Sequence, residues 1–176
     1  MINGVSVAIR YLTMKVVGID ASTTCSGLAI IEDGKLVYHD IIDMKRNRDS
    51  EKRVMDMMDE IGAFIIDNSP DVVYIEDSWN KQNIETTKML SNILGAVMYV
   101  CRENNIPFFK LLPSAWRSTV GIKLNKGGAK LKREELKKEA VNKVMRSHKI
   151  ECGDDEAEAI CIAEAGWLMQ ATDLFE

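Results

Sequence analysis

Acidic side chains stand beside three short apolar stretches of this sequence. Asp20 closes the run 15–20 (Lys-Val-Val-Gly-Ile-Asp), Glu76 closes the run 71–76, and the acidic segment 153–158 precedes the apolar stretch 159–163. Carboxylates at the ends of buried segments are costly unless they are paired or bind a metal ion. Three such places in one small chain predict a cluster of acids that holds a divalent cation.

The third acidic segment offers two carboxylates at helical spacing. Asp155 and Glu158 are three residues apart, so they lie on one face of a predicted helix and can point at a common site. Asp154 is the alternative to Asp155 if the register shifts by one residue, and acids here also cap a helix N-terminus. Converging carboxylates repel one another, and hard cations such as Mg²⁺ relieve that repulsion. Two such ions, roughly 3.5–4 Å apart, activate a water and stabilise a leaving 3′ oxygen in phosphodiester cleavage.

The elements that position these acids follow from apolar periodicity and turn residues. We expect strands at 16–19, 27–31, 35–42, 72–75 and 106–112, and helices at 50–68, 83–104, from 113, at 131–148 and at 154–169. Asp33-Gly34 predicts a two-residue hairpin turn, so the first three strands form an antiparallel meander. Ser50 is the expected N-cap of the first long helix, and Gly127-Gly128 predicts a flexible loop. The order indicates one mixed α/β domain at 14–176 after a peripheral N-terminal extension, residues 1–13.

Composition restricts the protein class. The chain has 176 residues, of which 46% are hydrophobic and 28% charged, and no apolar run approaches the roughly 20 residues of a membrane span. The four cysteines form no CxxC pair, which is typical of reduced thiols in a cytoplasmic protein. A zinc site that uses His148 and Cys152 lacks two further ligands at a recognisable spacing.

The net charge of −4 argues against a nucleic-acid partner, but its distribution argues for one. Residues 121–150 hold ten Lys or Arg and three Glu, a net charge of +7. Such a segment is either a phosphate-binding face or a solvated helix whose lysines keep the protein soluble. The charges alone do not separate these two interpretations.

Four motifs, in this order and at these intervals, resemble the RuvC family of Holliday junction resolvases, which have an RNase H-like fold. The resemblance covers residues 15–170, and its motifs are Gly18-Ile-Asp20-Ala-Ser22 with Gly27-Leu-Ala-Ile30, then Val73-Tyr-Ile-Glu76, Leu112-Pro-Ser-Ala-Trp-Arg-Ser-Thr-Val-Gly121 and Asp155-Glu-Ala-Glu158-Ala-Ile-Cys-Ile-Ala163. It implies a mixed five-stranded sheet, made of the meander plus two parallel strands and flanked by helices. One departure stands out: the family has an aspartate where this chain has Glu158.

The resemblance also implies a function. It predicts a Mg²⁺-dependent endonuclease (with Mn²⁺ as the alternative ion) that hydrolyses four-way junctions or other branched DNA, as a homodimer in a bacterial or phage-infected cell. The small size and the departures are similar to phage-type resolvases. The implied catalytic and metal-binding residues are Asp20, Glu76, Asp155 and Glu158, and the implied DNA-binding residues are Trp79, Arg117, Lys130, Lys132 and Arg133. The wide apolar stripe of 83–104 is the expected dimer contact.

Three other functions compete with this one. Asp20-Ala-Ser-Thr-Thr24 also resembles the phosphate hairpin of actin-like ATPases, but 176 residues cannot supply their two domains. A nuclease of the same fold that acts on structured RNA is the second. A non-catalytic nucleic-acid-binding module is the third, and the full set of four acids argues against it.

Overall fold

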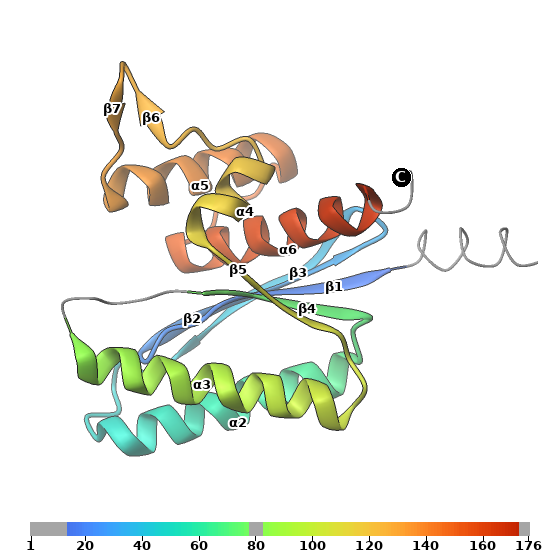
Figure 1. Cartoon of the computed structure of the whole chain (residues 1–176), viewed down its shortest axis with the longest axis vertical. Helices are drawn as coiled ribbons and strands as arrows, with labels where there is room; N and C mark the ends of the chain where they lie inside the picture. The colour runs from blue at the N-terminus through green and yellow to red at the C-terminus, as the bar shows by residue number, and fades with distance from the viewer. Residues whose placement is uncertain (1–13, 78–82, 173–176) are drawn as a thin grey trace, which may run out of the picture.

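A five-stranded mixed sheet forms the centre of the molecule (Figure 1). The computed structural model describes residues 14–77 and 83–172. The strand order is β3-β2-β1-β4-β5, in which the pairs β1–β2 and β2–β3 are antiparallel and the pairs β1–β4 and β4–β5 are parallel. The predicted combination of a three-stranded meander with two parallel strands is therefore confirmed.

The meander consists of β1 (Lys15–Asp20), β2 (Cys25–Glu32) and β3 (Lys35–Asp43). Asp33 and Gly34 connect β2 to β3 with positive φ angles of 53° and 74°. Two consecutive positive φ angles are typical of the primed turns whose twist suits a hairpin, which confirms the turn expected from Asp-Gly. The first strand, β1, is the central strand of the whole sheet.

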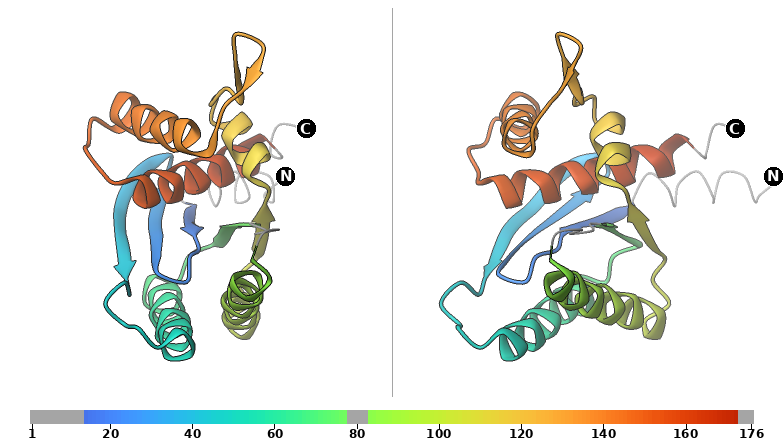
Figure 2. Two further views of the ribbon diagram at one scale, coloured as in Figure 1. Left: turned by 90° about the vertical axis from the view of Figure 1, so that its left-hand side faces the viewer. Right: turned by 60° about the vertical axis from the view of Figure 1, so that its left-hand side comes forward.

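Two parallel strands complete the sheet, and the helix that precedes each of them lies on one face. β4 (Val72–Glu76) follows α2 (Ser50–Asn68), and β5 (Phe108–Leu111) follows α3 (Ile84–Glu103). On the opposite face α6 (Asp154–Thr172) packs on the sheet, and α4 (Pro113–Thr119) and α5 (Arg133–His148) pack against α6. Figure 2 shows the sheet between these two helical layers.

The sheet separates two apolar cores, because alternate side chains of a strand point to opposite faces. Val17 and Ile19 of β1 pack with the buried side of α2 and α3, whereas Val16 packs with α6. The α6 backbone comes unusually close to the sheet at Gly18, where an added Cβ would lie 2.3 Å from the backbone nitrogen of Ala163. The N-terminal turn of α6, which contains the acids, is thereby held near the strand ends.

Two local expectations were wrong. Asp49, not Ser50, caps α2, and its side chain accepts hydrogen bonds from the backbone nitrogens of Glu51 and Lys52. The flexible loop expected around Gly127-Gly128 is instead a short hairpin of β6 (Asn125–Lys126) and β7 (Ala129–Lys130). This hairpin projects from the body of the molecule (Figures 1 and 2). Strands of two residues are too short to leave a periodic pattern in the sequence, which is why they escaped prediction.

No helix in the described part of the chain is long and apolar enough to cross a membrane. The N-terminal extension expected at residues 1–13 lies outside the described residues.

Candidate active site

The four predicted acids line one hollow at the carboxyl end of the central strands. Asp20 ends β1 and Glu76 ends β4. Ile19 pairs with Ile75 in the parallel register, so the acids that come next on the two adjacent strands lie side by side. Asp155 and Glu158, on the first turns of α6, line the same hollow. The topology thus brings together carboxylates that are up to 138 positions apart in the sequence.

Burial and repulsion between the carboxylates raise the pKa values of two acids in this hollow. Burial raises the pKa of Asp20 well above its ordinary value, and the negative charges of Glu158, Glu76 and Asp155 raise it further, against the opposing effect of Lys137. Burial also raises the pKa of Glu76. A site where ionised carboxylates are held at such cost favours a cation.

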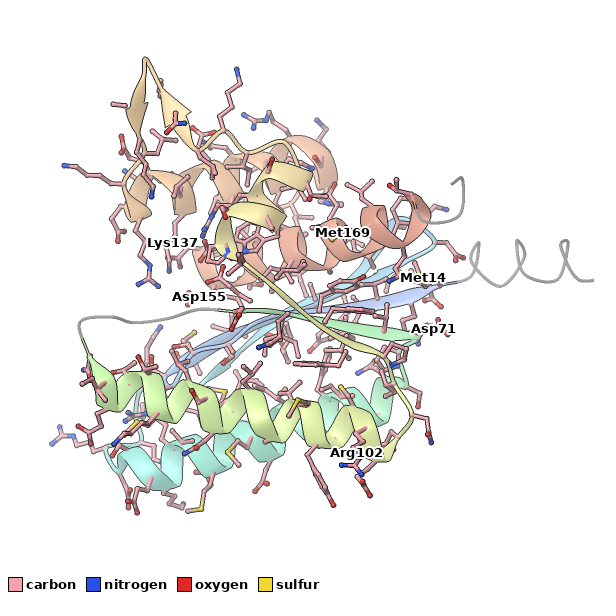
Figure 3. All side chains as sticks on the ribbon, viewed as in Figure 1. Met14, Asp71, Arg102, Lys137, Asp155 and Met169 are labelled. Carbon is pink, nitrogen blue, oxygen red and sulfur yellow. The ribbon has the colours of Figure 1, made fainter. Side chains whose placement is uncertain are left out.

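Two basic side chains partly neutralise the acids. Arg117 of α4, 7% exposed, donates to Oε1 of Glu158, and its Nη2 lies 4.0 Å from Oε2 of Glu76. Lys137 of α5 reaches Oδ1 of Asp155 at 3.2 Å (Figure 3). Each cation comes from a helix of the α4–α6 layer, so that layer supplies both acids and their counter-charges.

Asp155 and Asp154 have different surroundings. Asp155 lines the hollow, and its carboxylate accepts a hydrogen bond from the buried thiol of Cys25, whose pKa is raised to about 11 chiefly by burial and next by this bond. The side chain of Asp154 is half exposed and accepts a hydrogen bond from Lys137 at 2.7 Å, which lowers its pKa. Asp154 is absent from the residues that line the hollow.

The donor set suits a hard divalent cation, because all four acids offer carboxylate oxygens. Within residues 14–77 and 83–172, no three Asp, Glu, His or Cys side chains are already arranged to hold an ion, and this includes His148 and Cys152, considered above for zinc. Glu158 and Asp155 instead accept hydrogen bonds from Arg117 and Lys137.

The predicted DNA-binding residues take different positions. Lys130 and Arg133 line the hollow beside the acids, whereas Lys132 is exposed at the start of α5 and its backbone nitrogen bonds to Glu135. Arg117, expected at a phosphate, is instead buried against Glu158. The position predicted for Trp79 lies outside the described residues.

Three residues at the site were not predicted from the sequence. Trp116 is fully buried and donates from Nε1 to Oε2 of Glu76 at 2.7 Å, Lys137 pairs with Asp155, and Lys45 lines the hollow from the segment after β3. Lys137 belonged to the basic segment, but no local pattern distinguishes it from the neighbouring lysines. The pair Trp116-Arg117 in the motif after the predicted strand 106–112 was the one available signal for Trp116.

Comparison with known proteins agrees with this geometry. Residues 16–165 match the family model described as crossover junction endodeoxyribonuclease RuvC. Among curated proteins of that name, the one from Thermomicrobium roseum is 24% identical over 85% of this chain and 90% of its own length. The one from Carboxydothermus hydrogenoformans is 26% identical over 88% of this chain and 96% of its own length.

Two solved structures have the same fold. Thermus thermophilus RuvC, solved in complex with a Holliday junction substrate, superimposes with a TM-score of 0.73 at 17% identity and covers 92% of this chain and 97% of its own. The yeast mitochondrial Holliday junction resolvase Ydc2 gives a TM-score of 0.55 at 18% identity, over 94% of this chain and 82% of its own. The predicted RNase H-like fold is thus confirmed. From the family match over most of its length, this chain belongs to the RuvC family of crossover junction endodeoxyribonucleases.

Proposed function

We propose that this protein is a metal-dependent, structure-specific endonuclease that hydrolyses phosphodiester bonds in four-way junctions or other branched DNA. The observation that supports this most directly is the hollow in which four carboxylates and the basic side chains Lys130 and Arg133 lie together. Membership of the RuvC family points the same way, because its members are metal-dependent nucleases and the relatives are named for cutting crossover junctions.

In this proposal Asp20, Glu76, Asp155 and Glu158 hold Mg²⁺, with Mn²⁺ as a substitute. A bound metal would supply an activated water and charge stabilisation at the leaving oxygen. In the hydrolysis the water oxygen would bond to phosphorus and release a proton to solvent, while the bond from phosphorus to the 3′ oxygen breaks and that oxygen takes up a proton. The chain's own contribution is to hold the acids in a recess of limited solvent access, where Arg117 and Lys137 balance their charge.

The same hollow suggests how DNA is bound. Lys130 and Arg133 lie beside the acids on one side, and Lys45 lines the hollow from the segment after β3. Contacts from Lys and Arg to phosphates fix the position of nucleic acid without reading its sequence, which suits recognition of shape. Lys132 and Trp79 remain proposed contacts, the first to phosphate and the second to an unpaired base. Arg117 reaches a phosphate only if it leaves Glu158.

A homodimer fits a four-way substrate, since two-fold symmetry places two active sites on symmetry-related strands. The proposed contact is α3, whose apolar side chains Ile84, Met98 and Tyr99 are 73%, 55% and 62% exposed. Bacterial or phage-infected cytoplasm is the compartment in which such DNA would be met.

The decisive experiment is a cleavage assay with matched labelled four-way, three-way, flap and linear DNA, and with a structured RNA, in Mg²⁺ and in Mn²⁺. We expect cleavage of branched DNA, little of linear duplex and none in EDTA. Binding of junctions without cleavage in either ion would indicate a non-catalytic module. Preferential cleavage of RNA would support the structured-RNA alternative.

A further inference from the structure

Trp116 contacts one of the acids directly. It lies on α4, the short helix that follows β5, and its side chain is fully buried. A buried indole N–H needs an acceptor, and Nε1 of Trp116 finds it in Oε2 of Glu76 at 2.7 Å. The acceptor is therefore a member of the acidic cluster and not a backbone carbonyl.

The ring of Trp116 also packs against the guanidinium group of Arg117. The guanidinium carbon of Arg117 lies 4.2 Å from the centre of the Trp116 ring, a cation–π distance. Arg117 in turn donates to Glu158. Two consecutive residues of one short helix thus contact two different acids of the hollow, and Trp116 contacts both Glu76 and the partner of Glu158.

This contact fixes one end of a flexible side chain. A glutamate has three rotatable side-chain bonds, so its carboxylate points in one direction only if another group orients it. The bond from Trp116 occupies Oε2, while no hydrogen bond from the described residues reaches Oε1 of Glu76. With Oε2 held by Trp116, Oε1 can bind a ligand. Groups behind a metal-binding side chain commonly orient it in this way.

We propose that Trp116 is a positioning residue that orients Glu76 toward a divalent cation through its indole N–H. The proposal rests on the proposed function in one respect, namely that Glu76 binds the cation. It predicts that the N–H, and not only the bulk of the ring, increases the affinity of the site for the metal ion.

The variant Trp116→Phe tests the N–H, because it keeps an aromatic ring in the core and removes the donor. Mn²⁺ affinity is measured on the full chain without DNA, by the electron paramagnetic resonance signal of the free ion. We expect binding to weaken by about tenfold, the lower end of the effect of losing such an orienting partner. Half-maximal cleavage should need correspondingly more metal, and cleavage should recover at saturating Mn²⁺.

Trp167→Phe is the matched control. The Trp167 ring is partly buried too, but its Nε1 has no hydrogen-bond partner among the described residues, so its loss should leave Mn²⁺ affinity unchanged. If Trp116→Phe fails to fold, benzothienylalanine at position 116 replaces the N–H by sulfur at nearly the same shape. We expect it to weaken Mn²⁺ binding as Phe does.

The outcomes separate the two proposals. Wild-type Mn²⁺ affinity in a folded position-116 variant, or an equal loss in Trp167→Phe, would overturn the positioning role while the nuclease function stands. Weaker Mn²⁺ binding in the variant of a protein that cleaves no branched DNA would support the positioning role and refute the nuclease. A wild-type protein that binds no Mn²⁺ would refute both.

Discussion

At Asp20 the requirements of metal binding and of folding stability oppose each other. This residue ends the central strand, and burial together with three neighbouring carboxylates raises its pKa. An acid placed in this way is poorly suited to stability and well suited to binding a divalent cation. Substitutions at Asp20 should therefore affect activity and stability in opposite directions.

The first prediction concerns activity. Asp20→Asn and Glu76→Gln each remove one charge while they keep the shape of the side chain, so we expect cleavage of branched DNA to fall by at least about a hundredfold in Mg²⁺. Junction binding, measured by gel shift in Ca²⁺, should remain within a fewfold of wild type, since the basic side chains are untouched. Near-normal cleavage by either variant would refute its assignment as a metal ligand.

The second prediction concerns stability without metal. A carboxyl whose pKa is raised in the folded state contributes stability that is present below its unfolded pKa of about 4 and is lost as the pH rises through the folded pKa. Asp20→Asn abolishes this loss, so in EDTA the variant should unfold at a higher temperature than wild type at pH 8, by roughly 2–4 °C for each kcal/mol gained. The difference should shrink at pH 4.5.

Thermal unfolding followed by circular dichroism measures this difference. Asp59→Asn, at an exposed position of α2, is the control and should show no comparable change with pH. Equal melting temperatures for Asp20→Asn and wild type at pH 8 would contradict the claim that the ionised Asp20 carboxylate destabilises the folded protein.

At the scale of elements, the contact between α6 and the sheet decides where two of the acids lie. Gly27 of β2 faces the first turn of α6, and a Cβ there would come within 2.0 Å of the backbone oxygen of Asp155. Backbone atoms cannot give way as the end of a flexible side chain can. The spacing between sheet and helix, and with it the position of Asp155, therefore depends on the absence of a side chain at residue 27.

The third prediction follows from this contact. Gly27→Ala should displace the start of α6, lower the melting temperature and reduce cleavage by tenfold or more, even though it removes no functional group. Gly62→Ala is its control, because Gly62 lies within α2 and an added Cβ there would meet only the side chain of Val100, at an ordinary contact distance of 3.4 Å. That change should leave cleavage intact and stabilise the protein by about 0.5–1 kcal/mol. Full activity in Gly27→Ala would show that α6 can shift to make room for the Cβ without loss of the active-site geometry.

The elements that sequence reasoning located correctly are those with a strong local pattern. The turn at Asp33-Gly34 and the period of α2 and α3 depend on neighbouring residues, so they can be read from the chain. The cap of α2 is Asp49 and not Ser50; adjacent Asp and Ser are both good caps, so their types alone do not choose between them. The hairpin around Gly127-Gly128 has too few residues to show alternation.

The site divides in the same way. Asp20 and Glu76 were identifiable because each ends an apolar strand, and the sheet brings the two strand ends together. The partners of the acids were not identifiable. Trp116 lies 40 residues from Glu76, and Arg117 lies 41 residues from Glu158, so only the folded chain shows that they meet. The metal-binding role of the four acids stays a prediction.

At the scale of the whole molecule, the two helical layers have different surfaces. The layer of α4, α5 and α6 lies on one side of the sheet (Figure 2). It supplies Asp155 and Glu158 together with Arg117, Arg133 and Lys137. On the opposite layer, α3 exposes Met98 and Tyr99 beside its buried stripe. Exposed large apolar residues that gather on one helix are typical of a surface that binds another protein, which supports the proposed contact with a second copy of the chain.

The fourth prediction tests this surface. Met98→Asp places a charge at the centre of the proposed contact, so we expect the dimer dissociation constant, measured by analytical ultracentrifugation, to rise about tenfold or more. Val37→Asp on the edge strand β3 is the control, because Val37 is 53% exposed and Met98 55%. A wild-type chain that sediments as a monomer at micromolar concentration would refute the dimer, and an unchanged constant in Met98→Asp would place its interface elsewhere.

The projecting hairpin of β6 and β7 offers a route to engineering. Its two ends are joined by a hydrogen bond from the backbone nitrogen of Leu131 to the backbone oxygen of Leu124 at 2.9 Å, and its residues 125–130 are all exposed. A segment whose ends already meet can be exchanged for another of similar span without loss of buried contacts. Since Lys130 at its base lines the hollow, an exchanged hairpin would alter what approaches the acids while the scaffold that holds them stays intact.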